Sequence, residues 1–317
     1  MSLPKEPSTD PVAALTEKLE QGVREVFASG RYTEYLNTMS KFHLYSYGNI
    51  LLILMQNPAA THVAGFQAWK KNFGRNVKTG ERGIRILAPC PYRRFVEQEK
   101  RDQNGKPILG ADGAPLKERT LVQFLKYRAV TVFDISQTEG RELPSIGVSE
   151  LHGDISHYKE LADAITSVSP VPILYAAPPG AAKGCFNHLT EEIIIRPGMS
   201  QTQTIKTMLH EISHASLHRR KNSEPPSKDR RTREVEAESV AYVVCQHFGI
   251  DTSEYSFGYV AGWSSGKELD ELKASLDTIR TCAADLIDAI EEKLPDCIKW
   301  NEETGITSCK KSSLPEK

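Results

Sequence analysis

Hydrophobic residues recur every three to four positions over the first 56 residues, which is the period of an amphipathic α-helix. The pattern predicts helices over residues 12–27 and 32–42. A third predicted helix, residues 45–56, is nearly all apolar and stops before Asn57 and Pro58, because proline disfavours the helical conformation in the residue before it. The chain therefore begins with a group of helices.

Shorter apolar runs and turn residues dominate the next segment. Asn-Gly, Asp-Gly and Ala-Pro pairs between residues 101 and 116 predict a hairpin loop that joins two strands. The predicted elements here are a short helix at residues 65–72, a strand at 83–88, hairpin strands at 92–97 and 121–133, and a linker at 139–144. This mixture predicts an α+β first domain over residues 1–145.

The second half is predicted to form another domain, residues 146–295, in a chain of α+β class. Its expected elements are a helix at 157–167, strands at 172–175 and within 186–196, helices around 207–215 and 233–245, and a long helix at 267–294. Along the long helix, apolar residues spaced by three and four form one stripe for packing. The polar residues 296–317 are expected to be a disordered tail.

Two histidines four residues apart bracket a glutamate in the segment Thr-Met-Leu-His-Glu-Ile-Ser-His-Ala, residues 207–215. One helical turn places His210 and His214 on the same face, where two neutral imidazoles can bind one Zn²⁺. Glu211 lies beside them and can take a proton from a metal-activated water. The motif therefore predicts hydrolysis that depends on zinc.

A second, acid-rich helix offers a third ligand. Glu234 follows His214 after nineteen intervening residues, the separation found between the second histidine and the glutamate ligand of thermolysin-like zincins. Glu234 and Glu238 share a helix face, whereas Glu236 lies about 200° round the helix. We expect Glu234 to bind the metal and Glu238 to accept the outer N–H of a ligating histidine. The alternative is a solvated acidic face.

His218 extends the row of histidines on the first helix. The longer metzincin pattern has its third histidine where this chain has Arg220. We therefore expect His218 to satisfy carbonyls or the dipole at the helix end rather than to bind the metal. The strand expected before this helix is where an extended peptide would pair in zincins, which favours a peptide substrate.

Composition favours a cytoplasmic protein with two ordinary cores in 317 residues. The N-terminus lacks the basic and apolar regions of a signal peptide. The longest apolar run, residues 50–55, is far shorter than the roughly 20 residues of a membrane span. Six cysteines without a CxxC pair suggest neither a disulfide framework nor a cysteine zinc site, so we expect reduced thiols.

The net charge of −1 conceals an uneven distribution. Residues 1–140 carry 20 Lys and Arg against 14 Asp and Glu, whereas residues 141–317 carry 20 against 27. The basic residues concentrate between 70 and 94, where aromatic residues are interleaved, and this mixture suits single-stranded nucleic acid. The candidate contact residues are Trp69, Lys70, Lys71, Phe73, Arg75, Lys78, Arg82 and Arg85. The alternative is a solvated basic surface over core aromatics.

Several motifs resemble one known family. From about residue 184 to 263, the HEISHASLH helix, the basic loop, the EVEAESVAYVVC helix and the tyrosine-rich segment around Tyr259 resemble the zincin-like domain of ArdC-type antirestriction proteins, and more distantly ImmA/IrrE-type metallopeptidases. The patterns at residues 35–49, 65–86 and 132–138 resemble the N-terminal single-stranded-DNA-binding domain of the same family. The resemblance covers about 230 of the 317 residues.

The resemblance implies a protein of a plasmid, transposon or phage-related element. It would hold single-stranded DNA through its first domain and act on an unidentified protein or peptide through a zinc site in its second. In that mechanism Glu211 deprotonates water and passes the proton to the leaving amine. Tyr259, or Tyr255 near it, would stabilise the oxyanion.

The sequence leaves two alternatives open for the function of the protein. In the first, the protein is a DNA-binding antirestriction factor whose zinc site is not catalytic, and Glu211 is dispensable. In the second, it is a regulatory protease of the ImmA/IrrE kind that cuts a repressor, and the basic region only locates that target on DNA.

Overall fold

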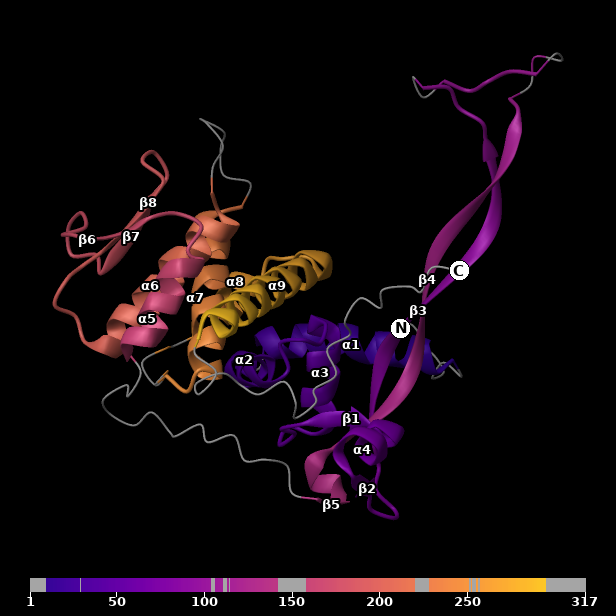
Figure 1. Cartoon of the computed structure of the whole chain (residues 1–317), viewed down its shortest axis with the longest axis horizontal. Coiled ribbons are helices and arrows are strands. Elements are labelled where there is room, and N and C mark those ends of the chain that lie inside the picture. Colours follow the sequence, from indigo (N-terminus) through magenta and orange to yellow (C-terminus); the bar gives the residue numbers. More distant parts are fainter. Residues whose placement is uncertain are drawn as a thin grey trace, which may run out of the picture. The chain divides into compact units, whose positions relative to one another are not determined.

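The computed structural model describes residues 10–28, 30–103, 106–110, 113, 115–141, 158–219, 228–250, 252, 255 and 257–294. The mixture of helices and strands confirms the predicted α+β class (Figure 1). The predicted tail, residues 296–317, and the end of the predicted linker, residues 142–144, lie outside the described residues.

The helices are α1 (Pro11–Ala28), α2 (Tyr32–Lys41), α3 (Tyr47–Gln56), α4 (Phe66–Phe73), α5 (Tyr158–Val168), α6 (Gln201–Leu217), α7 (Arg230–His247), α8 (Val260–Ser264) and α9 (Leu269–Lys293). The strands are β1 (Val63–Gly65), β2 (Arg75–Val77), β3 (Ile84–Glu99), β4 (Lys117–Asp134), β5 (Thr138–Gly140), β6 (Ile173–Tyr175), β7 (Gly184–Asn187) and β8 (Glu192–Ile195). A short 3-10 helix, Ile135–Gln137, joins β4 to β5.

Side-chain caps set where the main helices begin. Ser200 caps α6 by accepting a hydrogen bond from the backbone N–H of Gln203, and Asp229 caps α7 by accepting one from Thr232. The start of α9 is a capping box, in which Glu268 and Glu271 satisfy each other's backbone N–H groups. These caps fix the positions of the helices that carry the acidic and histidine residues.

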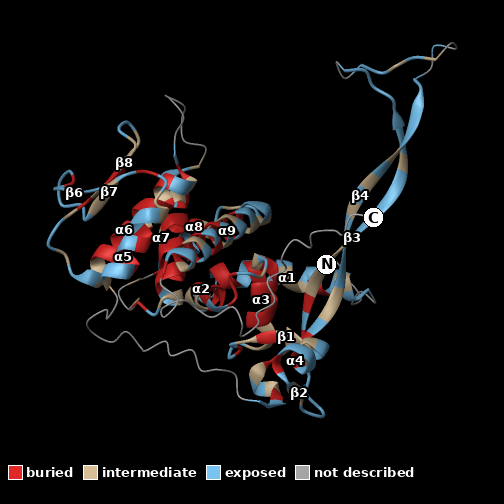
Figure 2. Ribbon diagram, in the orientation of Figure 1, coloured by how far each residue is buried: buried red, intermediate tan, exposed pale blue. Residues whose placement is uncertain are grey.

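Helix α7 lies at the centre of the helical body. It packs against α6, α9 and α2, and its residues from Val235 to Cys245 are almost all buried (Figure 2). The hydroxyl groups of Tyr32 on α2 and Ser239 on α7 are 2.8 Å apart, and Tyr242 on α7 donates a hydrogen bond to Asn37. The ring of Phe27 on α1 contacts that of Trp263 on α8. Helices from both halves of the sequence thus share one core. The division into domains at residue 145 stays a prediction.

Internal contacts divide the chain into two units, one of residues 1–16 and 85–130 and the other of residues 17–84 and 131–317. The first unit contains most of the hairpin formed by β3 and β4, whose residues are largely exposed (Figure 2). The two strands that we expected at 83–88 and 92–97 are one continuous strand, β3. Its Pro89 and Pro91 cannot donate to a ladder, but β3 is an edge strand of the sheet β1-β4-β3, where proline is tolerated.

Residues 138–140, which we expected in a linker, form β5 and pair with β2 in an antiparallel ladder. The remaining sheet has the order β6-β8-β7, with β6 parallel and β7 antiparallel to β8. The pair β7 and β8 confirms the strands expected within residues 186–196. Within the described residues, no helix is both long enough and apolar enough to cross a membrane.

Trp69 is a core residue of the unit that contains α4. Its side chain is 1% exposed, and its indole N–H donates to the carbonyl of Phe133 at 2.8 Å. Replacing Trp69 with alanine should lower the free energy of unfolding by about 3–5 kcal/mol, because the change leaves a cavity and an unpaired carbonyl. Urea denaturation checks this, with Phe66→Ala as control, since Phe66 lies on the same helix and is 52% exposed. Equal losses in the two variants would contradict the assignment of Trp69 to the core.

Candidate metal centre and active site

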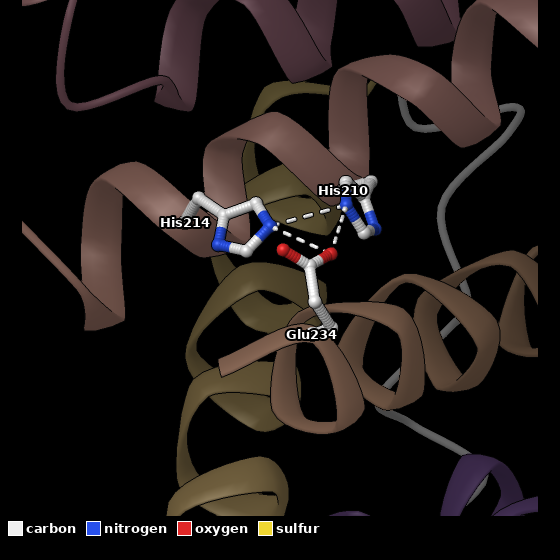
Figure 3. Close-up of side chains that lie close together, drawn as sticks. All are labelled: His210, His214 and Glu234. Atoms are coloured by element: carbon white, nitrogen blue, oxygen red, sulfur yellow. Dashed lines mark hydrogen bonds and ion pairs between the residues drawn. The ribbon is translucent and has the colours of Figure 1, made fainter. Parts of the chain in front are cut away.

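Three side chains from two helices converge at the candidate metal centre (Figure 3). The Nε2 atoms of His210 and His214 on α6 are 3.1 Å apart. An Oε2 atom of Glu234, on α7, lies 3.7 Å from the first and 3.6 Å from the second. The structure therefore brings together the three residues that the sequence proposed as ligands.

This donor set fits a zinc ion. Zinc takes imidazole nitrogen and carboxylate oxygen at about 2.0–2.2 Å in a tetrahedral arrangement, so that neighbouring ligand atoms lie about 3.3–3.5 Å apart. The three measured separations between ligand atoms, 3.1, 3.6 and 3.7 Å, bracket that value. His210, His214 and Glu234 could hold one ion with little movement.

The charges of the three groups support the same arrangement. The hydrogen bonds from both histidines hold the pKa of Glu234 well below its usual range, against the effect of burial. Burial lowers the pKa of His214, which favours the neutral form that binds metals. Burial also lowers the pKa of His210, but the neighbouring carboxylates, Glu234 first, outweigh it and the net shift is upward. Glu234 is thus an ionised candidate ligand beside two imidazoles.

Glu211 is buried beside the three candidate ligands, with 8% of its surface exposed. Burial raises the pKa of its carboxyl, and the backbone N–H of Phe186 on β7 opposes that rise by hydrogen bonding. Strand β7 approaches α6 so closely that a Cβ atom on Gly184 would lie 2.6 Å from Thr207 and 3.1 Å from the Cγ of Glu211. A glycine at position 184 is therefore required for β7 to lie against the carboxylate.

The two tyrosines named from the sequence have different surroundings. The hydroxyl of Tyr259 donates to Glu238 at 2.5 Å, and burial followed by the nearby carboxylates raises its pKa. Glu238 is therefore the partner of a tyrosine hydroxyl. Tyr255 packs against the rings of Tyr242 and Phe257 and lies under the ammonium group of Lys206. Of the two, Tyr259 is the one whose pKa responds to the charge of Glu234.

His218 and Glu236 make buried contacts that the sequence analysis did not predict. The His218 side chain was expected to satisfy the carbonyls at the end of α6, but it lies between the ring of His214 and the carboxylate of Glu236, 3.1 Å from each. Glu236 does point away from the face of Glu234, but it is fully buried rather than solvated. Two features of the sequence could have predicted this contact. His218 follows His214 by four residues, and Glu236 is an acid within an otherwise apolar helix.

The candidate nucleic-acid residues divide into three groups. Trp69 and Phe73 are buried, and their rings lie 4.9 Å apart in the core, so Trp69 offers no face on which a base could stack. Arg75 and Lys78 donate hydrogen bonds to Thr138 and to the carbonyl of Ser136, which fastens them to the segment after β4. The third group, Lys70, Lys71, Arg82 and Arg85, is exposed.

The hairpin β3–β4 carries exposed aromatic residues that the candidate set did not include. Tyr92 and Phe95 are 43% and 61% exposed, and Tyr92 stacks on Phe124 with ring centroids 5.6 Å apart. The guanidinium of Arg94 lies 4.5 Å from the centroid of the Phe124 ring, and that of Arg119 lies 5.5 Å from that of Phe95. Cations and aromatic faces thus alternate on this hairpin.

Two parts of the chain match known protein families. Residues 9–133 match the N-terminal domain of the anti-restriction factor ArdC. Residues 175–246, which include both histidines of the metal centre and Glu234, match the IrrE N-terminal-like domain. The chain belongs to the ArdC-type antirestriction protein family, with a more distant relation to proteins of the IrrE type.

Individual relatives are similar over different lengths. An uncharacterized protein of Bacillus anthracis is 28% identical over 302 residues, covering 85% of this chain and 49% of that protein. The DNA primase TraC of Escherichia coli is 28% identical over 239 residues, covering 69% of this chain and 15% of the primase. The chain therefore spans about half of the first relative and a small part of the second.

Solved structures of the antirestriction ArdC protein from the R388 plasmid are also similar. The Mn(II)-bound structure has a TM-score of 0.49 at 19% identity, over 86% of this chain and 97% of that one. The metal-free structure has a TM-score of 0.45 at 19% identity, over 78% of this chain and 84% of that one.

Proposed function

We propose that this chain is an antirestriction-type protein of a mobile element, which binds single-stranded DNA and carries a zinc-dependent metallopeptidase site. The observation that carries the proposal is the convergence of His210, His214 and Glu234 beside the buried carboxylate of Glu211. Family membership supports the antirestriction role. The similarity to a DNA primase is consistent with a role in DNA transfer.

Each residue of the site has a chemical task in this proposal. When bound, the ion would supply a Lewis acid that activates water and polarises a peptide carbonyl. Glu211 accepts a proton and returns it to the leaving amine, a role that suits a carboxylate whose pKa is raised by burial. Tyr259 would donate its hydroxyl proton to the oxyanion in place of its hydrogen bond to Glu238. A peptide would pair with β7, an outer strand of its sheet that lies against Glu211.

Metal binding is the first test. Glu234→Ala should lose zinc far more readily than Glu238→Ala, because it removes one of three ligands, whereas Glu238 bonds to Tyr259. Zinc content after dialysis against a weak chelator, measured by mass spectrometry, checks this, with Mn²⁺ loaded in parallel because it also accepts carboxylate. Equal retention of the metal in the two variants would overturn the ligand assignment.

Catalysis is tested by Glu211→Gln. The amide has nearly the same size but cannot take a proton, so the variant should keep its fold and metal and lose about 10²–10⁴-fold in any peptide cleavage. In cells, protection of incoming DNA during conjugal transfer should fall with it. A Gln variant that retains its zinc and protects DNA as well as the wild type would favour a non-catalytic metal site in a DNA-binding factor.

The similarity to IrrE-type domains favours a second candidate, a regulatory protease that cuts a repressor. Both candidates require Glu211, and they differ in the protein that is cleaved. In the antirestriction role the effect appears on incoming DNA, whereas in the regulatory role it appears as transcription from a repressed promoter. Comparing the two readouts in one Glu211→Gln strain distinguishes them.

For single-stranded DNA, the hairpin β3–β4 is the surface with the required chemistry. Single strands bind where cations follow the phosphates and aromatic faces stack on bases. The hairpin has exposed aromatic rings, and Arg94 and Arg119 lie over rings of the hairpin. Its strands also carry the exposed basic residues Arg85, Arg93, Lys126 and Arg128. Lys70 and Lys71 on α4 are exposed as well, but the aromatic neighbours Trp69 and Phe73 are buried.

Replacing Arg94 and Arg119 together with alanine should flatten the dependence of DNA affinity on salt, by about 0.7 in slope for each lost phosphate contact. Phe95→Ala should instead cost roughly 1–3 kcal/mol of binding and leave the slope nearly unchanged. Fluorescence-anisotropy titrations of a short oligonucleotide at several salt concentrations measure both. The matched control is a Lys70→Ala, Lys71→Ala double variant on α4. Loss of affinity in that control alone would move the DNA surface from the hairpin to α4.

A further inference from the structure

Tyr259 lies in a segment that buried aromatic rings hold on both sides. The residue directly precedes α8, and its hydroxyl is the proposed donor to the oxyanion. Two positions earlier, Phe257 is 7% exposed, and its ring lies 5.4 Å from that of Tyr32 on α2, measured between centroids. Four positions later, Trp263 is 5% exposed, and its ring lies 5.6 Å from that of Phe27 on α1. Rings of the two N-terminal helices therefore hold the backbone around Tyr259.

These contacts connect α8 with the N-terminal helices and with α7. The rings of Phe27 and Tyr32 stack on each other with centroids 5.2 Å apart. On the α7 side, the indole N–H of Trp263 donates to the hydroxyl of Thr232 at 3.0 Å. Thr232 belongs to the first turn of α7, two residues before Glu234. Helix α8 is thus fixed both to the N-terminal helices and to the start of the helix that carries a candidate ligand.

The side chain of Tyr259 is directed by a carboxylate of α7. Tyr259 is 38% exposed, and its hydroxyl donates to Glu238 at 2.5 Å. Glu238 follows Glu234 by four residues, so the two carboxylates share a face of the helix. Because a tyrosine hydroxyl has one proton to donate, its bond to Glu238 has to be exchanged for one to the oxyanion in the proposed reaction.

Both restraints have the same physical effect. Without a partner, a partly exposed tyrosine would donate to water and distribute over several rotamers. The held backbone and the carboxylate remove that freedom before any substrate arrives. A donor that is already in place needs no reorganisation when the oxyanion forms, and this is the condition under which such donors contribute most to the rate.

We propose that Glu238 and Phe27 are positioning residues for Tyr259, so that a helix from the N-terminal half of the chain completes the candidate active site. The inference rests on the proposed peptidase reaction for its consequence, but the placement of Tyr259 is a property of the metal-free protein. Phe27 lies in the range that matches the ArdC N-terminal domain, and Glu238 lies in the range that matches the IrrE N-terminal-like domain. The N-terminal helices then have a task in peptide cleavage that is separate from DNA binding.

The first experiment measures cleavage of a quenched fluorogenic peptide by the zinc-loaded, full-length protein. Tyr259→Phe removes the donor and should lower kcat by about 10²–10³-fold with little change in KM. Glu238→Ala should also lower kcat rather than raise KM, and Glu238→Gln should restore most of it, because the amide oxygen still accepts a hydrogen bond. If Glu238 acts through Tyr259, the double variant Glu238→Ala, Tyr259→Phe is no slower than Tyr259→Phe alone.

Phe27→Leu tests the contribution of the N-terminal helix. The substitution removes the ring that contacts Trp263, so kcat should fall in the wild-type background and stay constant in the Tyr259→Phe background. The matched control is Phe42→Leu, because both phenylalanines are 2% exposed and Phe42 follows α2, where its ring contacts Tyr45. Circular dichroism at the assay temperature checks that both variants are folded.

The placement of Tyr259 can be observed in the full-length, metal-free protein. When its tyrosine rings are labelled with ¹³C at Cζ, the chemical shift of each Cζ responds to the hydrogen bond of that hydroxyl. The Tyr259 signal is the one missing in Tyr259→Phe. Glu238→Ala and Phe27→Leu should each shift or broaden this signal, whereas Phe42→Leu should leave it in place. An unchanged Tyr259 signal in Glu238→Ala would overturn the proposal, whether or not the protein binds a metal.

The outcomes separate the two proposals. If Tyr259→Phe cleaves as fast as the wild type, or if the effects of Glu238→Ala and Tyr259→Phe multiply in the double variant, Glu238 does not act through the tyrosine. If Phe27→Leu and Phe42→Leu lower kcat equally, the N-terminal ring contributes only to stability. If the wild type binds no zinc or cleaves no peptide, the proposed function fails, while the tyrosine spectra still decide whether Glu238 and Phe27 position Tyr259.

Discussion

The fully buried carboxylate of Glu236 is the constraint on which the helical body depends. A charge in a protein interior costs several kcal/mol unless it is paired and hydrogen-bonded. Removing any one of its partners therefore destabilises the folded protein. Here those partners come from His218 at the end of α6, from Lys228 before the start of α7, and from Ser275 on α9. Satisfying one carboxylate therefore fixes how three segments pack.

The same constraint determines the direction of Glu234, the candidate metal ligand on α7. Residues two apart on a helix point about 200° from one another, so a helix rotated to bury Glu236 toward His218 turns Glu234 toward a different part of α6. That part carries His210 and His214, the next turns back along the same face as His218. One packing between α6 and α7 thus serves the structural carboxylate and the ligand carboxylate together, and a small rotation of α7 would disturb both.

What the sequence predicted well depended on local spacing. His210, Glu211, His214 and Glu234 come together because helical periodicity fixes which residues share a face, and the helices themselves follow from apolar spacing and caps. What it missed depended on distant partners. The spacing showed that Glu236 points away from Glu234, but only the packing of α9 and α6 reveals a buried pocket of donors there. The burial of Trp69 has the same cause, because its indole partner is the carbonyl of Phe133.

Helix α7 also explains why the two halves of the sequence are not independent in stability. Tyr32, which is 2% exposed, and Ser239 form a hydrogen bond inside the core, and Asn37 accepts from Tyr242 one turn further along α7. Separating α2 from α7 would expose Tyr32 and leave buried polar groups without partners, each at a cost of about 1–3 kcal/mol. The site on α6 and α7 is therefore braced on one face by Glu236 and its donors and on another by the N-terminal helices. Binding of a ligand that changed the position of α2 would be transmitted to α7 through these contacts, because packed helices shift as units rather than deform.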